Sequence, residues 1–305
     1  MKAPVAAIRR SLLAWYARNG RAGLPWRTAR NPYHTLVSEF MLQQTQVDRV
    51  VDRFNDFIAR FPDFAALSRA STADVLRAWK GLGYNSRAVR LKRLAETVCR
   101  EYGGSMPSDA AALRAFAGVG AYTVAAIRTF AFDLDDAPID TNVRRIVQRL
   151  FFGLEYPHAA PHRELDARAR ELAPRGQAHD WYSAMMDAGA AICTARAPKC
   201  LICPLRDACA AAPVDAARLE RLRAGAKPAA RPAQPFEQTM RYARGRIVDR
   251  LRELPPGRSI SLLDLHGTLQ SLLPGRSLDD VRDLVGGLER DGLLTRRGER
   301  IALPE

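Results

Sequence analysis

Four of the five cysteines in this chain lie within seventeen positions, and this cluster limits how that part of the chain can fold. The stretch reads C-T-A-R-A-P-K-C-L-I-C-P-L-R-D-A-C, residues 193–209, with the spacing C-x6-C-x2-C-x5-C. Thiols placed so close together form disulfides, bind zinc or ligate an iron–sulfur cluster. The four candidate ligands are Cys193, Cys200, Cys203 and Cys209.

The surroundings of the cysteine cluster argue against disulfides. The N-terminus has no apolar region followed by a small-residue cleavage site, so we predict no secretory signal, and cytosolic thiols stay reduced. Structural zinc sites usually contain two close cysteine pairs, whereas here single cysteines flank one close pair. The spacing therefore favours an iron–sulfur cluster and leaves zinc open.

The charge of the chain indicates a polyanionic partner. The formal net charge is +14 over 305 residues. The basic residues are spread along the chain, which is typical of a basic groove rather than a basic tail. No run approaches the ~18 uncharged apolar residues that a membrane span needs. We expect a cytoplasmic protein that binds no membrane.

Composition and periodicity divide the chain into three parts. Residues 1–212 are predicted to be almost wholly helical, with short glycine and proline breaks. Residues 213–235 contain several prolines among small and basic residues, which predicts a linker. Residues 236–305 predict three helices and a small hairpin, the pattern of a winged-helix-like domain. The predicted fold class is mainly α.

Helix starts are predicted at serines that precede helical patterns. Ser71 and Ser108 are candidate N-caps in the long helical part. In the C-terminal part, Ser277 is the expected cap of the third helix, and Ser261 directly precedes the second.

A glycine-rich turn lies between two helical segments in F-A-G-V-G-A-Y-T, residues 116–123. Gly118 and Gly120 permit a tight turn with outward amides, and the N-terminus of the next helix adds a positive dipole end. This arrangement suits a DNA phosphate. The same pattern is also common in ordinary turns between helices.

Two acidic residues lie in unusual contexts. Glu39 is surrounded by apolar residues, where partial burial would raise its pKa and keep a proton available near neutral pH. Asp140 follows a Pro-Ile pair and precedes a helix, so on its own it is interpreted as an N-cap. From these features alone, the chain is a basic helical protein with a metal cluster.

Several motifs taken in order resemble the helix–hairpin–helix DNA glycosylases, most closely the adenine-DNA glycosylases of the MutY type. The resemblance covers residues from about 24 to 212, and the ordered set is specific although no single motif is. It implies a helix–hairpin–helix glycosylase fold in which the four cysteines hold a [4Fe–4S] cluster. The motifs are L-P-W-R (24–27), N-P-Y-H-T-L-V-S-E-F-M-L-Q-Q-T-Q-V (31–47), G-L-G-Y-N-S-R-A (81–88), G-V-G-A-Y-T (118–123), D-T-N-V-R-R (140–145) and M-M-D-A-G-A-A-I-C-T (185–194).

The resemblance implies excision of a base that has left the DNA stack. It assigns Glu39 as the general acid that protonates adenine and Asp140 as the carboxylate that stabilises an oxocarbenium-like sugar. Tyr122 and Asn142 match positions that line this site. The endonuclease III branch carries a Schiff-base lysine at the position of Tyr122, so we predict base removal without an efficient lyase step.

The resemblance also implies DNA contacts. Gln44, Leu82 and Tyr84 match positions that probe or wedge the base on the opposite strand. The expected partner is double-stranded DNA with adenine opposite 8-oxoguanine or guanine, bound by a monomeric, bacterial-like enzyme associated with the nucleoid. The full set of expected DNA-contacting residues is Arg27, Gln44, Thr45, Leu82, Tyr84, Gly118 and Gly120.

The sequence departs from the family pattern at several places. Phe116-Ala117 replaces the usual Leu-Pro, a change expected to affect packing only, and Thr141 is shared with the endonuclease III branch. Ser183 replaces a Gln or Glu that often contacts the adenine. Residues 236–305 are too short for the Nudix-like domain that many members use to recognise 8-oxoguanine. Either this part contributes differently, or recognition depends on the catalytic domain.

Three other functions remain open from the sequence. They are a thymine/uracil mismatch glycosylase, an endonuclease III-like bifunctional glycosylase/lyase, and a DNA-binding protein without catalysis. The absence of lysine at position 122 argues against the second. The presence of both Glu39 and Asp140 argues against the third.

Overall fold

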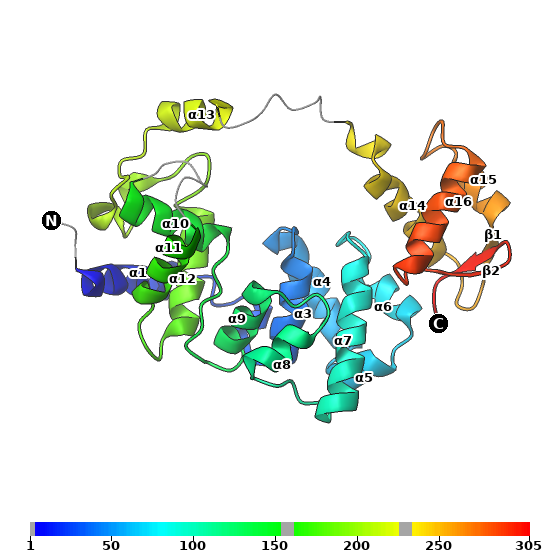
Figure 1. The fold of residues 1–305 in the computed structure, drawn as a ribbon, viewed down its shortest axis with the longest axis horizontal. Helices are drawn as coiled ribbons and strands as arrows, with labels where there is room; N and C mark the ends of the chain where they lie inside the picture. The colour runs from blue at the N-terminus through cyan, green and yellow to red at the C-terminus, as the bar shows by residue number, and fades with distance from the viewer. Residues whose placement is uncertain (1–3, 154–161, 226–233) are drawn as a thin grey trace. The chain divides into compact units, whose positions relative to one another are not determined.

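The computed structural model describes residues 4–153, 162–225 and 234–305 (Figure 1). The chain forms two compact units. The first unit is built within Met1–Thr35 and Ser108–Ala230, and the second within Leu36–Pro107 and Arg231–Glu305. Almost all regular structure is helical, which confirms the predicted mainly α fold.

The first unit contains the N-terminal helix and most of the middle of the chain. Helix α3 (Pro32–Leu42) starts within the residues of the first unit and continues into those of the second. The helices of the first unit are α1 (Val5–Asn19), α2 (Pro25–Thr28), α8 (Ala110–Ala115), α9 (Ala121–Phe130), α10 (Thr141–Phe152), α11 (His162–Leu172), α12 (Ala178–Ala191) and α13 (Ala216–Gly225), with short 3-10 helices η1 (Cys200–Ile202) and η2 (Arg206–Ala208).

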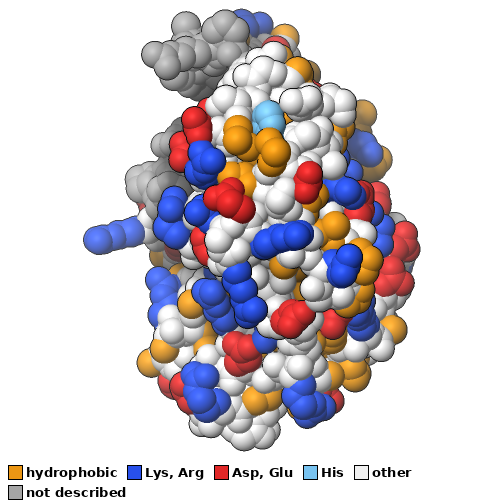
Figure 2. Space-filling model, turned by 90° about the vertical axis from the view of Figure 1, so that its right-hand side faces the viewer, with side chains coloured by type: hydrophobic (Ala, Val, Ile, Leu, Met, Phe, Trp, Pro, Cys, Tyr) orange, Lys and Arg blue, Asp and Glu red, His pale blue; other side chains and the backbone are white. Residues whose placement is uncertain are grey.

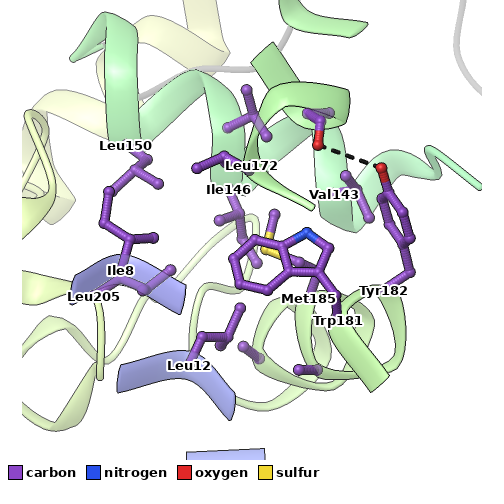
Figure 3. Packing of buried hydrophobic residues seen from close by; sticks show 14 of the residues in the cluster. Ile8, Leu12, Val143, Ile146, Leu150, Leu172, Trp181, Tyr182, Met185 and Leu205 are labelled. Atoms are coloured by element: carbon purple, nitrogen blue, oxygen red, sulfur yellow. Dashed lines mark hydrogen bonds between the residues drawn. The ribbon is translucent and has the colours of Figure 1, made fainter. Parts of the chain in front are cut away.

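The core of the first unit forms where α1 and α10 pack against α12 and α11 packs against α10. Trp181 and Tyr182 of α12 are fully buried among Ile8, Leu12 and Ile146 (Figure 3). The Tyr182 hydroxyl donates a hydrogen bond of 3.3 Å to the backbone oxygen of Ala169. Burying such large apolar side chains stabilises each by roughly 1.5–3 kcal/mol. This packing fixes α10 against α12, and α10 carries Asp140 at its start.

The second unit combines residues 36–107 with the C-terminal region. Helix α7 (Ser86–Tyr102) packs against α5 (Phe64–Arg69) and α6 (Thr72–Ala78), and α14 (Met240–Arg252) packs against α6. The other helices of this unit are α4 (Val47–Arg60), η3 (Phe236–Gln238), α15 (Leu262–Leu269) and α16 (Leu278–Arg290).

The C-terminal region has the predicted three helices and hairpin. Strands β2 (Thr295–Arg297) and β3 (Arg300–Ala302) flank Gly298, whose φ of 61° suits a tight turn. A third strand, β1 (Ile260–Ser261), was not predicted and pairs antiparallel with β3 in the order β1-β3-β2. Two residues give no period-2 pattern, so only the long-range pairing identifies this strand.

The predicted helix caps are confirmed at two of three serines, Ser71 and Ser277, and Ser261 before the second helix is a cap as well. The side chains of Ser71, Ser261 and Ser277 accept hydrogen bonds from backbone amides three residues ahead. The prediction at Ser108 is wrong. Asp109 caps α8 instead, and its Oδ1 accepts from the Ala112 amide at 2.8 Å. Both residue types cap helices well, so the sequence does not separate two adjacent candidates.

The division into domains at residues 212 and 235 stays a prediction. Helix α13 lies within the predicted linker, so residues 216–225 of that linker are helical. Residues 226–233 of that linker lie outside the described residues. In the described ranges, no helix combines the length and apolar character needed to cross a membrane.

Candidate active site and cysteine loop

Asp140 lies at the N-cap of α10, as the sequence predicted. Its Oδ1 accepts a hydrogen bond of 2.8 Å from the Val143 amide, and its Oδ2 accepts one of 2.7 Å from the Asn142 side chain. Burial raises the pKa of Asp140, while the bonds from Val143 and Asn142 and the nearby charge of Arg145 oppose the rise. Asn142 therefore lies where it favours the carboxylate form of Asp140.

Arg145 connects the Asp140–Asn142 pair to the cysteine loop. Its Nη2 donates to Asn142 Oδ1 and to the Gly189 oxygen, both at 2.7 Å, and its Nε donates to the Cys193 oxygen at 2.6 Å. The arginine is 9% exposed, so these bonds form mostly away from water. A chain of charge-assisted hydrogen bonds thus runs from Asp140 to the backbone of Cys193.

Because Gly189 has no side chain, it leaves room for the Asn142 side chain of this network. A Cβ at position 189 would lie 2.5 Å from the Cβ of Asn142. Real Cβ atoms do not approach so closely, and Asn142 cannot move without disturbing its bond to Asp140. The glycine of the A-G-A-A segment in α12 is therefore required by the packing of the candidate active site.

The four clustered cysteines line one small cavity of about 20 Å³. Burial and the neighbouring thiols raise the pKa of Cys203 to about 11, and burial raises the pKa of Cys209. Crowded thiolates are costly unless a cation offsets their charge. Within the described ranges, the side chains do not adopt an arrangement of three or more His, Cys, Asp or Glu groups that would hold a metal ion.

Buried guanidinium groups bond the first residues of the cysteine loop. Arg149 is 1% exposed, and its Nη1 donates to the Sγ of Cys193 at 3.3 Å and to the Thr194 oxygen at 2.8 Å. A positive charge therefore lies against the Sγ of Cys193. Four thiols around one cavity, with a guanidinium group in contact, fit the chemistry of a thiolate-bound cluster.

The predicted glycine turn joins α8 to α9. Gly118 has a φ of 86°, a conformation that side chains other than glycine rarely adopt, and Gly120 is the N-cap of α9. Both glycines are exposed. Tyr122 is half-buried in the first turn of α9. The turn therefore leads directly into the N-terminus of α9, and its binding of an anion stays a prediction.

Three candidate DNA-contacting residues lie on two neighbouring loops of the second unit. Gln44 is exposed, Leu82 is 4% exposed and Tyr84 is half-buried. Gln44 and Tyr84 both have positive φ, 57° and 44°, which costs energy for residues with a Cβ. Strained backbone of this kind persists only where the surroundings fix it.

Arg87 fixes both loops. Its Nη1 donates to the oxygens of Phe40, Met41 and Gln43, and its Nη2 donates to the Leu82 and Gly83 oxygens and to Thr45 Oγ1. The side chain is 2% exposed, and burial lowers its pKa to about 10. Thr45, a predicted DNA contact, is thus a partner of this arginine.

Glu39 and Arg27 complete the predicted set. Glu39 is half-buried on α3, in the range of the second unit. Arg27 is only 12% exposed, and its Nη1 donates to the buried carboxylate of Asp187 at 2.8 Å. Burial raises the pKa of Asp187, but Arg27 and Arg21 outweigh it and lower that pKa overall. The DNA contact of Arg27 stays a prediction, and so does the pairing of Glu39 with Asp140.

Comparison with known proteins identifies the family of this chain. Residues 37–174 match the HhH-GPD superfamily of base excision DNA repair proteins. The adenine DNA glycosylase of Mycolicibacterium smegmatis is 38% identical over 295 residues, which span 94% of this chain and 95% of that protein. The chain is an adenine DNA glycosylase-type member of the HhH-GPD superfamily. The resemblance to the helix–hairpin–helix DNA glycosylases, inferred from the motifs, is therefore confirmed. The chain is an enzyme of the DNA N-glycosylase class.

Other glycosylases in the superfamily are also similar. The thymine/uracil-DNA glycosylase of Pyrobaculum aerophilum is 35% identical over 203 residues, covering 65% of this chain and 88% of that protein. The structure of a thermostable thymine-DNA glycosylase aligns with a TM-score of 0.63 and 31% identity, covering 68% of this chain and 95% of that one. The M. smegmatis alignment spans nearly the whole glycosylase, so it includes most of the C-terminal region.

Sequence reasoning missed the residues that hold the site together. Arg87, Arg145 and Asp187 are buried and make several hydrogen bonds each, yet none was a predicted site residue. All three lie within recognised motifs, which was the available signal. Ser183, expected near the adenine, is fully buried, and its Oγ has no hydrogen-bond partner among the described residues. Phe116 is 6% exposed, consistent with the expected packing role.

Proposed function

We propose that this glycosylase removes adenine from double-stranded DNA in which adenine lies opposite 8-oxoguanine or guanine. The observation that carries the proposal is the Asp140 carboxylate, held by the Val143 amide and the Asn142 side chain at the start of α10. Support comes from the full-length similarity to an adenine DNA glycosylase and from the acidic residue Glu39 in the same recognised motif set.

In the proposed reaction, Glu39 donates a proton to the adenine ring of a base that has left the stack. The bond between the sugar and the base then breaks, and its electron pair leaves with the protonated adenine. The sugar becomes oxocarbenium-like, and the Asp140 carboxylate stabilises its positive charge. Water adds to the sugar and loses a proton, which leaves free adenine and an abasic site.

The neighbours of Asp140 support its role as a carboxylate. Hydrogen bonds from Val143 and Asn142, together with the positive charge of Arg145, oppose the rise in pKa caused by burial. Tyr122 has no amine that could form a Schiff base, so we infer a monofunctional enzyme. The exposed turn around Gly118 and Gly120 is proposed to bind a DNA phosphate through backbone amides.

We also propose that Cys193, Cys200, Cys203 and Cys209 hold a [4Fe–4S] cluster. The shared cavity and the Arg149 contact to Cys193 support this ligand set. When bound, such a cluster supplies covalent cross-links between segments of the loop. Arg145 then connects the cross-linked loop to Asn142, because it bonds both the Cys193 backbone and the Asn142 side chain.

A base-release assay on four duplexes tests the substrate. The duplexes carry adenine opposite 8-oxoguanine, adenine opposite guanine, thymine opposite guanine, and uracil opposite guanine. We expect release of adenine from the first two and no release from the others. Release from the thymine or uracil duplexes alone would place the enzyme with the thymine/uracil glycosylases, which the similarity to the Pyrobaculum protein keeps as the second candidate.

A further inference from the structure

The C-terminal region contacts the turn that carries Tyr84. The guanidinium carbon of Arg241, in the first turn of α14, lies 3.8 Å from the centroid of the Tyr84 ring. This is a close cation–π contact. Arg87 also lies over the Tyr84 ring, at 5.6 Å. Two arginines from distant parts of the sequence therefore hold one aromatic ring.

The position of α14 beside this turn is fixed by buried bonds. Arg252 at the end of α14 is 8% exposed and donates to the Leu76 oxygen and to Asn85 Oδ1, both at 2.8 Å. The amide of Ala73 donates to the Pro304 oxygen at 2.7 Å. The contact between Arg241 and Tyr84 thus belongs to a built interface within the second unit.

An open groove runs along this interface. Its volume is about 840 Å³, and its lining includes Gln44, Tyr84, Arg49 and Arg241. Gln44 and Tyr84 were predicted from the motifs to contact DNA. The groove therefore extends the predicted DNA-contacting loops onto α14, which sequence reasoning treated as part of a separate domain.

The arginines that line the groove differ in whether they pair with an acid. Arg246 and Arg252 pair with Asp249, and Arg244 pairs with Asp291. Arg49 and Arg241 are exposed, and neither forms an ion pair with an acid in the part of the chain that the structure describes.

One face of the molecule carries side chains of both charge signs close together (Figure 2). On the side of the molecule seen in Figure 2, Lys and Arg side chains are interspersed with Asp and Glu. Positive charge left without an acidic partner in a groove attracts phosphate groups and releases their counterions. A groove with two such guanidinium groups beside an aromatic ring fits a nucleic-acid strand better than a small neutral ligand.

We propose that this groove binds the DNA phosphate backbone through Arg241 and Arg49, and that Arg241 joins the C-terminal region to the DNA-binding surface by packing on Tyr84. The proposal rests on the proposed function, since the DNA is the mismatched substrate. The C-terminal region then contributes to substrate binding by charge and by support of Tyr84.

The test measures DNA binding by full-length protein, separately from base release. Fluorescence anisotropy gives the Kd for a duplex with a 2′-fluoro-substituted adenosine opposite 8-oxoguanine, over a range of salt concentrations. The variants are Arg241→Ala, Arg49→Ala and Arg241→Lys. Arg250→Ala is the matched control, because Arg250 lies on the same helix, pairs with Glu253 and does not line the groove.

We expect Arg241→Ala and Arg49→Ala each to weaken binding roughly fivefold near physiological salt and to reduce the slope of log Kd against log salt by about 1. Arg241→Lys should restore the slope, because lysine also pairs with phosphate as a point charge. Arg250→Ala should bind as the wild type does. Thermal unfolding midpoints checked for each variant exclude loss of folding as the cause.

Equal binding by Arg241→Ala and Arg250→Ala would overturn the inference, and so would an Arg241→Lys variant as weak as Arg241→Ala. Base release by the wild type separates this failure from failure of the proposed function. If the wild type releases adenine while Arg241→Ala binds normally, only the groove proposal fails. If the wild type releases no adenine while Arg241→Ala binds weakly, the groove stands and the proposed substrate fails.

Discussion

A buried arginine organises each of two regions, and the two differ in what they bind. Arg145 in the first unit joins Asn142, the Gly189 oxygen and the Cys193 oxygen. Arg87 in the second unit binds five backbone oxygens and one hydroxyl, at the end of α3 and on the two loops. The first connects side chains of the candidate chemistry, and the second fixes the shape of backbone loops.

The electrostatics of the two arginines differ in the same way. Burial lowers the pKa of Arg145, while Cys193 and Asp140 oppose this. Burial lowers the pKa of Arg87 to about 10, and only Tyr84 opposes this among the groups that contribute. The region proposed for chemistry therefore couples charges, whereas the region proposed for DNA contact uses a charge to satisfy uncharged oxygens.

The largest effect on stability is expected at Arg87. Replacing it with methionine leaves several buried carbonyl oxygens without donors, so the free energy of unfolding should fall by about 3–5 kcal/mol. Urea denaturation measures this change. The control is Arg90→Met on the same helix, since among the described residues Arg90 bonds only Ser86, and the change should alter stability by less than about 0.5 kcal/mol. Similar losses in both variants would show that Arg87 does not hold the loops.

A smaller loss of stability, with a loss of activity, is expected at Arg145. Arg145→Met should lower the free energy of unfolding by about 2–4 kcal/mol and slow single-turnover adenine release roughly 10- to 100-fold, because Asn142 loses its support. The neighbouring Arg144→Met, which breaks a partly exposed ion pair with Asp166, serves as the control. A stable Arg145→Met enzyme with normal release would remove the proposed connection between the cysteine loop and Asp140.

Gly189 offers a test of packing alone. Gly189→Ala places a methyl group 2.5 Å from the Cβ of Asn142 and should destabilise the protein by about 1–3 kcal/mol. Gly286→Ala on α16 is a matched control of opposite sign, because its Cβ meets only a flexible arginine end at 3.6 Å. That change should stabilise by about 0.4–1 kcal/mol. A neutral Gly189→Ala variant would show that Asn142 has room to move.

The smallest expected effect is a shift in pH dependence. Burial already raises the pKa of Asp140, and the Asn142 side chain opposes the rise. Asn142→Ala removes that donor, so the pKa should rise further and the acidic limb of the release rate should move to higher pH. Thr141→Ala, an exposed neighbour, should leave the limb unchanged. A limb that moves to lower pH in Asn142→Ala would contradict the proposed role of the amide.

Local patterns predicted the fold well where the signal was local. The caps at Ser71 and Ser277 and the turn at Gly298 follow from residues within a few positions of each other. Asp109 displaced Ser108 as a cap because both bond backbone amides well and only the backbone path decides between them.

The connections between distant segments were not predictable from the sequence. Arginines on a helix normally lie at the surface, and nothing local shows that Arg87 bonds a loop more than 40 residues away. The same holds for Arg241 and Tyr84, which lie in parts assigned to separate predicted domains. The motif resemblance indicated which positions matter, and the structure shows which side chains support them.

The most direct test of the account is single-turnover adenine release from duplexes with adenine opposite 8-oxoguanine by wild-type, Glu39→Gln and Asp140→Asn enzymes. Each variant should retain the wild-type thermal unfolding midpoint within a few degrees and lose about 10²- to 10⁴-fold in release rate, the range for a lost acid or a lost charge-stabilising group. Release at the wild-type rate by either variant would contradict the account.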